Sequence, residues 1–126
     1  MSRPERFDRL VAEAKKNISE IEPGEAEAKA GSGEAMIIDV RDEDEWSEEH
    51  IPGAIHLSRG TIELDIEEKV SDPNAVVIVH CGGGGRSALA AQSLQEMGYK
   101  NVRSMAGGLK AWKAAGLPTT SKAERT

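Results

Sequence analysis

The feature that most constrains the fold is an apolar run followed at once by four glycines. Residues 75–80 read AVVIVH, and the dominance of β-branched side chains predicts a buried strand. The glycines of CGGGGRS follow, and then RSALAAQSLQEMG gives a mostly apolar helical face over 88–97 that ends at Gly98. A strand, a tight loop and a helix in this order are typical of an open α/β sheet, in which ligands lie at the carboxyl ends of the strands.

Apolar runs and helical patterns alternate along the rest of the chain. The predicted strands are a short edge segment at 18–21 and runs at 36–40, 54–57, 75–80 and 101–105. Helices are predicted at 1–17, 44–49 and 88–97, and the stretch 62–70 is predicted to be partly helical. A short Ala/Glu helix follows a turn at Pro23-Gly24 and is ended by Gly31 and Gly33. A closing helix is ended by Gly116 and Pro118. This alternation predicts an α/β domain with a mainly parallel sheet.

We divide the chain into an N-terminal helical extension at 1–17, one domain at 18–118 and a frayed tail at 119–126. The formal net charge of -6 argues against nucleic acid and anionic membranes as main partners. The apolar runs are too short to span a bilayer, and the charged start MSRPERFDRL has no apolar signal region. A single cysteine excludes an internal disulfide and suits a reducing compartment, so we expect a cytoplasmic protein.

The glycine loop places the only cysteine, Cys81, where an anion would bind. Glycines coil tightly, so consecutive N–H groups can point at one centre, and the dipole of the following helix adds to this. A thiol there is expected to have a depressed pKa, and the planar guanidinium of Arg86 can bind two oxygens of an oxyanion. The interpretation is a nucleophilic cysteine in an anion site; the alternative is a glycine-rich turn with a structural cysteine and a solvated arginine.

Two reactions use such a site. A phosphatase transfers a phosphoryl group to the thiolate, whereas a sulfurtransferase transfers one sulfur atom and forms a persulfide that a second nucleophile then cleaves. Phosphate needs a wide loop and a sulfur atom a narrow one, and here four residues separate Cys81 from Arg86.

Three stretches together resemble a single-domain rhodanese, a thiosulfate sulfurtransferase. They are IIDVRDEDEWSEEHIPGAIHL, VVIVHCGGGGRS and GYKNVRSMAGGLKAWKAAGLP, and they span about 36–118. The resemblance implies a three-layer α/β/α fold with a five-stranded, mainly parallel sheet. It implies that Cys81 becomes the persulfide, that Arg86 closes the loop, and that no cofactor or metal is needed. The implied backbone amide cradle comprises Gly82, Gly83, Gly84, Gly85 and Ser87.

The implied reaction moves a sulfane sulfur from thiosulfate or a persulfide donor to cyanide or a thiol. Rhodaneses have four residues between the cysteine and the basic residue, whereas related tyrosine phosphatases have five, so a phosphatase or arsenate reductase is the weaker enzymatic alternative. A persulfide carrier or regulatory module that docks to a partner protein, such as a sulfur-relay protein, is the non-catalytic alternative. We expect a monomer or weak homodimer.

The loop departs from the family in its composition. Gly84 matches the usual glycine, but related proteins usually carry side chains at some of the positions of Gly82, Gly83 and Gly85. Donor selection is then expected at the rim of the site, where Arg59 is either a donor-binding residue or a solvated one.

The remaining polar residues are interpreted as structural. Asp39 and Arg41 are expected to form a buried or partly buried pair, and His50 to hydrogen-bond within a turn. The acidic run 42–49 is expected to be a solvated helix face. His50, His56, His80 and Cys81 fit no standard zinc spacing. Trp46 and Trp112 are expected to pack, and Gly107-Gly108 to let the last helix begin close to the active loop.

Overall fold

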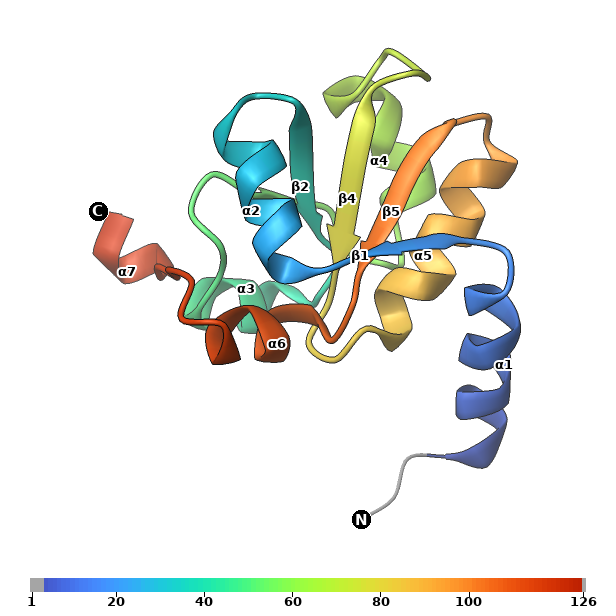
Figure 1. Ribbon diagram of the computed structural model, residues 1–126, viewed down its shortest axis with the longest axis horizontal. Helices are drawn as coiled ribbons and strands as arrows, with labels where there is room; N and C mark the ends of the chain where they lie inside the picture. Colours follow the sequence, from blue (N-terminus) through green and yellow to red (C-terminus); the bar gives the residue numbers. More distant parts are fainter. Residues whose placement is uncertain (1–3, 126) are drawn as a thin grey trace.

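The computed structural model describes residues 4–125 and has a parallel sheet at its centre (Figure 1). The elements in chain order are α1 (Glu5–Lys15), β1 (Ser19–Ile21), α2 (Pro23–Gly31), β2 (Ala35–Asp39), α3 (Glu43–Glu48), β3 (Ile55–His56), α4 (Ile62–Lys69), β4 (Val76–His80), α5 (Gly85–Glu96), β5 (Asn101–Met105), α6 (Gly108–Ala114) and α7 (Lys122–Arg125). The strand order is β1-β5-β4-β2-β3, and every neighbouring pair is parallel. The predicted five-stranded sheet is confirmed, with β1 at an edge.

Two apolar cores cover the two faces of the sheet, because successive side chains of a strand point to opposite faces. Val77 and Val79 of β4 pack with α4 and α5, whereas Ile78, between them, packs with α2 and α6. Figure 1 shows the two helix pairs on opposite sides of the strands. The three-layer α/β/α architecture is therefore confirmed.

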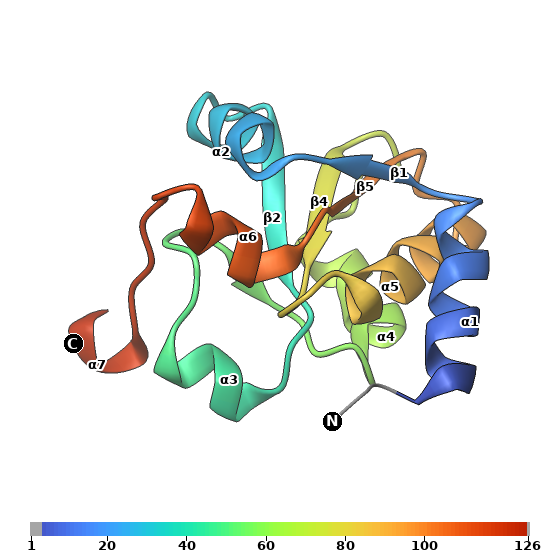
Figure 2. The same ribbon diagram turned by 60° about the horizontal axis from the view of Figure 1, so that its bottom comes forward.

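The helix α1 packs against the outer side of α5 (Figure 2). Val11 and Ala14 are buried there against Ala88, whereas Leu10 is 55% exposed. Within the predicted helix 1–17, the first three residues lie outside the described part of the chain. The helix thus adds a layer to the domain beside the start of α5.

Two local expectations need correction. Pro23-Gly24 is the first turn of α2 and not a separate turn, since proline suits a helix start, where its missing N–H needs no partner. The stretch 62–70 forms a regular helix, α4, because Ile62 and Ile66 are both fully buried on one face.

The C-terminal segment is ordered further than the expected frayed tail. Thr120 pairs with His50 through backbone hydrogen bonds of 2.8 Å in each direction, and α7 follows. Residue 126 lies outside the described part of the chain. Within residues 4–125, no helix has the length and apolar character needed to cross a membrane.

Candidate active site

The glycine loop leaves the central strand β4 at its carboxyl end and leads into α5. Gly84 is the N-cap of this 12-residue helix and has φ of 104°, a left-handed conformation that favours glycine. A side chain at Gly84 would also lie 3.3 Å from the Gly107 backbone nitrogen. Both observations explain why this glycine is the one that the loop requires.

The sulfur of Cys81 lies among donors at the N-terminus of α5. The N–H groups of Gly84 and Ser87 donate to Sγ at 3.1 and 3.4 Å, and the Ser87 hydroxyl lies 3.6 Å from it. Burial raises the pKa of the Cys81 thiol, since the residue is only 1% exposed. Hydrogen bonds from the Ser87 hydroxyl and from the N–H groups of Ser87, Gly84 and Gly83 outweigh burial, so the pKa lies below its ordinary value. The site therefore favours the nucleophilic thiolate.

The start of α6 closes over the same loop. The N–H of Leu109 donates to the Cys81 carbonyl at 2.8 Å, and the N–H of Lys110 donates to the Gly82 carbonyl at 3.1 Å. A Cβ on Gly108 would lie 2.3 Å from the Cys81 carbonyl oxygen, and Gly107 and Gly108 both have positive φ. The predicted close approach of the helix after Gly107-Gly108 is confirmed for α6, and its N–H groups fix the loop backbone.

Arg86 is held by a carboxylate from another element. Its Nη1 and Nη2 lie 2.8 and 3.1 Å from the two carboxylate oxygens of Glu45 in α3. Glu45 also accepts from the Asp42 N–H at 3.1 Å in the capping box of α3. The Arg86 hydrogen bond is the main cause that lowers the pKa of Glu45 to about 2.

The expectation of a solvated helix face over 42–49 is therefore wrong for Glu45. The capping-box spacing of Asp42 and Glu45 was the available signal for its orientation, but nothing in the sequence linked it to Arg86.

A cavity of about 320 Å³ opens beside the sulfur. It is lined by Phe7, Cys81, Gly83, Gly85 and Arg86. The structure thus brings most of the predicted loop to one cavity and adds Phe7 from α1, which sequence reasoning missed.

Arg59, unlike Arg86, does not line the cavity beside Cys81. Its guanidinium pairs with Glu63 in the first turn of α4 at 2.9 Å. A donor-binding role for Arg59 stays a prediction.

The other polar residues are structural. Asp39 and Arg41 form a buried pair with N–O distances of 2.8 to 3.2 Å, as predicted. His50 is buried, its Nδ1 lies 2.6 Å from the Trp46 carbonyl oxygen, and its ring stacks on Trp46. In the described part of the chain, no three His, Cys, Asp or Glu residues form a group that could hold a metal ion. Trp46 and Trp112 are buried, which confirms their packing roles.

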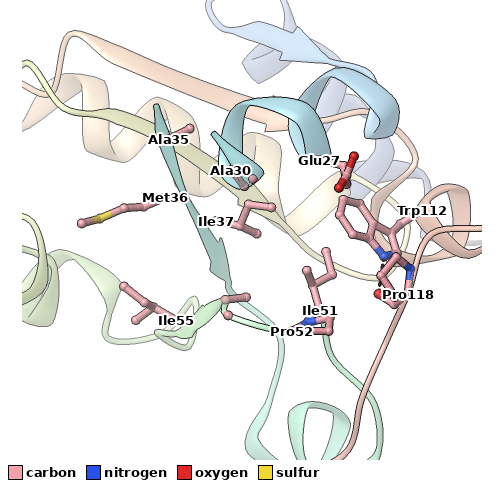
Figure 3. Close-up of a pocket in the computed structure, with 13 residues that line it drawn as sticks. Glu27, Ala30, Ala35, Met36, Ile37, Ile51, Pro52, Ile55, Trp112 and Pro118 are labelled. Atoms are coloured by element: carbon pink, nitrogen blue, oxygen red, sulfur yellow. Dashed lines mark hydrogen bonds between the residues drawn. The ribbon is translucent and has the colours of Figure 1, made fainter. Parts of the chain in front are cut away.

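A second cavity, of about 280 Å³, lies on the α2 and α6 side of the sheet (Figure 3). Ile37, Ile51 and Trp112 contribute apolar walls, and Glu27 lies at its edge. None of the predicted site residues line this cavity. Cys81 therefore lines the cavity beside the glycine loop and not this second one.

Comparison with known proteins supports a specific chemistry. The family model of the Rhodanese-like domain matches residues 22–115. The chain is 41% identical over 99 residues to "Thiosulfate sulfurtransferase GlpE" of Coxiella burnetii, covering 79% of this chain and 88% of that protein. It is 32% identical over 97 residues to "Putative sulfur carrier protein YrkF" of Bacillus subtilis, covering 76% of this chain and 51% of that protein. The solution structure of the polysulfide-sulfur transferase homodimer from Wolinella succinogenes superposes with a TM-score of 0.79 at 31% identity, covering 92% of this chain and 88% of that chain.

Proposed function

Because the chain belongs to the rhodanese-like domain family, we propose that it is a thiosulfate sulfurtransferase that carries the transferred sulfur on Cys81. The observation that carries this assignment is the position of Cys81 Sγ. It accepts hydrogen bonds from two main-chain N–H groups at the start of α5 and lines a cavity. Such donors stabilise a negatively charged sulfur without occupying the space beside it.

The first half-reaction loads the cysteine. The Cys81 thiolate attacks the outer sulfur of thiosulfate, a new S–S bond forms, and the original S–S bond breaks. Sulfite leaves with the electron pair of that bond, and Cys81 becomes a persulfide with a negatively charged terminal sulfur. The N–H groups of the glycine loop that face the cavity are the proposed donors to this terminal sulfur.

The second half-reaction unloads it. Cyanide or a thiolate attacks the terminal sulfur, the persulfide S–S bond breaks, and the electron pair returns to Cys81 as thiolate. The products are thiocyanate or a new persulfide, so the enzyme alternates between two covalent states in a ping-pong cycle. The reaction requires one sulfur donor and one acceptor as partners.

Arg86 is the proposed binding residue for the oxyanion end of the donor. It lines the cavity with Cys81 and presents a planar, permanently charged guanidinium. Its pairing with Glu45 fixes the orientation of that plane in the absence of donor. The negative charge of Glu45 also offsets the charge of Arg86, which favours release of sulfite after transfer.

The carrier alternative rests on one relative that is named a putative sulfur carrier. In that case the persulfide of Cys81 is delivered to a protein thiol, and a sulfur-relay protein is the partner. A lone thiol needs a reducing environment to stay available, and we propose the cytoplasm as its location.

Intact mass spectrometry after treatment with thiosulfate tests the assignment. The wild-type chain is expected to gain the mass of one sulfur atom, and cyanide is expected to remove it. Cys81→Ser is the matched control, which should keep the fold and gain nothing. Absence of the added sulfur in the wild type, or thiosulfate turnover by the serine variant, would refute the assignment of Cys81.

Two further assays separate the alternatives. Slow cyanide turnover with fast transfer to a protein thiol would favour the carrier. Hydrolysis of p-nitrophenyl phosphate without thiosulfate turnover would favour the phosphatase.

A further inference from the structure

Two buried hydroxyl groups connect the sulfur of Cys81 to the sheet. Ser87, in the first turn of α5, has its Oγ 3.6 Å from Sγ. Ser104, in β5, has its Oγ 2.8 Å from Ser87 Oγ. Both serines are fully buried. The two hydroxyls thus form a chain that starts in the sheet and ends on the nucleophile.

Ser104 occupies a fully buried position in the sheet. It lies in β5 between Val102, which is buried, and Met105, which is fully buried, and it pairs in register with Val79 of β4. A buried hydroxyl is unfavourable unless it is hydrogen-bonded. Within residues 4–125, Ser87 Oγ is the partner of the Ser104 hydroxyl. The position of Ser104 is therefore explained by what it does to Ser87.

Each hydroxyl has one proton, so the chain can run in only two directions. If Ser87 donates to Ser104, the Ser87 proton is not available for a hydrogen bond to Cys81. If Ser104 donates to Ser87, the Ser87 proton is free to point at Sγ, where it meets a thiolate. The second direction is favoured, because a hydrogen bond to an ionised acceptor is stronger than one between neutral groups, and bonds in a chain reinforce one another.

We propose that Ser104 is a positioning residue for the sulfur-transfer reaction: its hydroxyl donates to Ser87 Oγ and so directs the Ser87 proton toward Cys81 Sγ. Ser104 itself does not contact the sulfur-accepting face of Cys81, because the cavity beside the sulfur is lined by other residues. Among the hydrogen bonds that lower the pKa of Cys81, the one from the Ser87 hydroxyl has the largest effect, which agrees with this role. The inference rests on the proposed function only in that Cys81 reacts as a thiolate.

The test is the pH dependence of Cys81 alkylation by iodoacetamide in the full-length chain. Cys81 is the only cysteine, so the rate reports its thiolate fraction directly. Ser104→Ala is expected to raise the apparent pKa of alkylation by about half a unit, because Ser87 Oγ loses the donor that strengthens its own hydrogen bond to the thiolate. Ser87→Ala is expected to raise it by at least as much. The double variant is expected to equal Ser87→Ala, because Ser104 acts only through Ser87.

The controls separate positioning from packing. Ser32→Ala removes an exposed serine and should leave the alkylation profile unchanged. Thermal unfolding of each variant shows which ones are folded, and Ser104→Val, which removes the same hydroxyl with a side chain that suits a buried strand, replaces the alanine variant should that one fail to fold. An unchanged alkylation profile in a folded Ser104 variant would overturn the inference. So would a shift in the apparent pKa that is the same when Ser104→Ala is introduced into the wild type and into Ser87→Ala. Thiosulfate turnover is measured separately, so its absence in the wild type would refute the proposed function without touching this result.

Discussion

At the scale of single residues, the orientation of Arg86 depends on Glu45. The guanidinium has both terminal nitrogens on the two carboxylate oxygens, at 2.8 and 3.1 Å. It also lies close to the loop, since a Cβ on Gly82 would be 3.3 Å from Arg86 Nη2. The absence of a side chain at Gly82 therefore leaves room for the guanidinium beside the loop. This arrangement fixes the plane of the charged guanidinium beside the loop.

Arg86→Ala is expected to lower kcat/KM for thiosulfate by more than tenfold. The variant removes a charge-assisted contact to the oxyanion, and such contacts contribute about 1.5–3 kcal/mol. Steady-state kinetics with thiosulfate and cyanide measure the effect. Arg86→Lys is the matched control, because it keeps the charge but loses the planar guanidinium. Its kcat/KM should lie between those of the wild type and the alanine variant. A kcat/KM equal to that of the wild type in the alanine variant would show that Arg86 is structural.

The placement of Cys81 and Arg86 at one cavity could be predicted because one short segment carries the whole signal: a β-branched strand, glycines and a helix. Glu45, Phe7 and Ser104 could not be, because they reach the site from other elements. Glu45 is 41 residues from Arg86, and Ser104 is 17 residues from Ser87. A hydrogen bond between distant segments depends on strand order and helix packing, and neither leaves a pattern within one segment.

At the scale of elements, the glycines of the loop between β4 and α5 differ in backbone conformation and in the space around them. Gly84 needs a left-handed φ and lies against Gly107, whereas Gly83 has no positive φ and an added Cβ there would meet nothing within 4 Å. Only Gly84 is required by the backbone, so a side chain is tolerated at Gly83.

Gly83→Ala and Gly84→Ala are therefore expected to have opposite effects. Alanine at Gly83 should stabilise the protein by about 0.4–1 kcal/mol, because it restricts the unfolded chain at no cost to the native loop. Alanine at Gly84 should destabilise it by about 1–2 kcal/mol, because of the left-handed backbone. Urea denaturation of both variants measures the difference. Equal effects would show that the loop adopts another backbone conformation.

Element boundaries were predictable where composition changes sharply. Gly98 and Gly116 follow the ends of α5 and α6, and both have positive φ, as residues that end helices commonly do. The errors fell where proline or tertiary pairing decides. Pro23 begins a helix as readily as a turn, and Thr120 is ordered by pairing with His50, which is distant in sequence.

At the scale of the whole molecule, the five parallel strands and two helix layers were predictable because alternating strands and helices leave few alternatives. The placement of α1 was not. Its apolar face indicates that it packs on another element, but only the structure shows that it lies along α5 and brings Phe7 to the cavity beside Cys81.

Two groups make global stability depend on pH: His80, buried at the end of β4, and Glu45 of α3, paired with Arg86. His80 ends β4, is fully buried, and has Nδ1 3.2 Å from the Cys81 carbonyl oxygen and Nε2 3.6 Å from Asp39 Oδ2. Burial lowers the pKa of His80, against the opposing effects of Asp39 and of the Cys81 carbonyl. Glu45 also has a lowered pKa, but its titration lies far lower, near about 2. The two groups therefore act in separate pH ranges.

The free energy of unfolding is expected to fall as the pH drops below about 6.5, the ordinary pKa of histidine. In that range the unfolded chain binds a proton at His80 that the folded chain excludes, so acid favours unfolding by up to about 1.4 kcal/mol per pH unit. The loss should continue until the folded His80 itself protonates. Glu45 adds a second loss only below its ordinary range, as the pH falls from about 4.3 toward 2, because its carboxylate stays paired with Arg86 above that range. Urea denaturation at intervals from pH 7 to 5 measures the first effect, and His80→Gln, which cannot titrate, should remove most of the slope. A slope in His80→Gln as steep as that of the wild type would mean that acid acts on the fold through other groups.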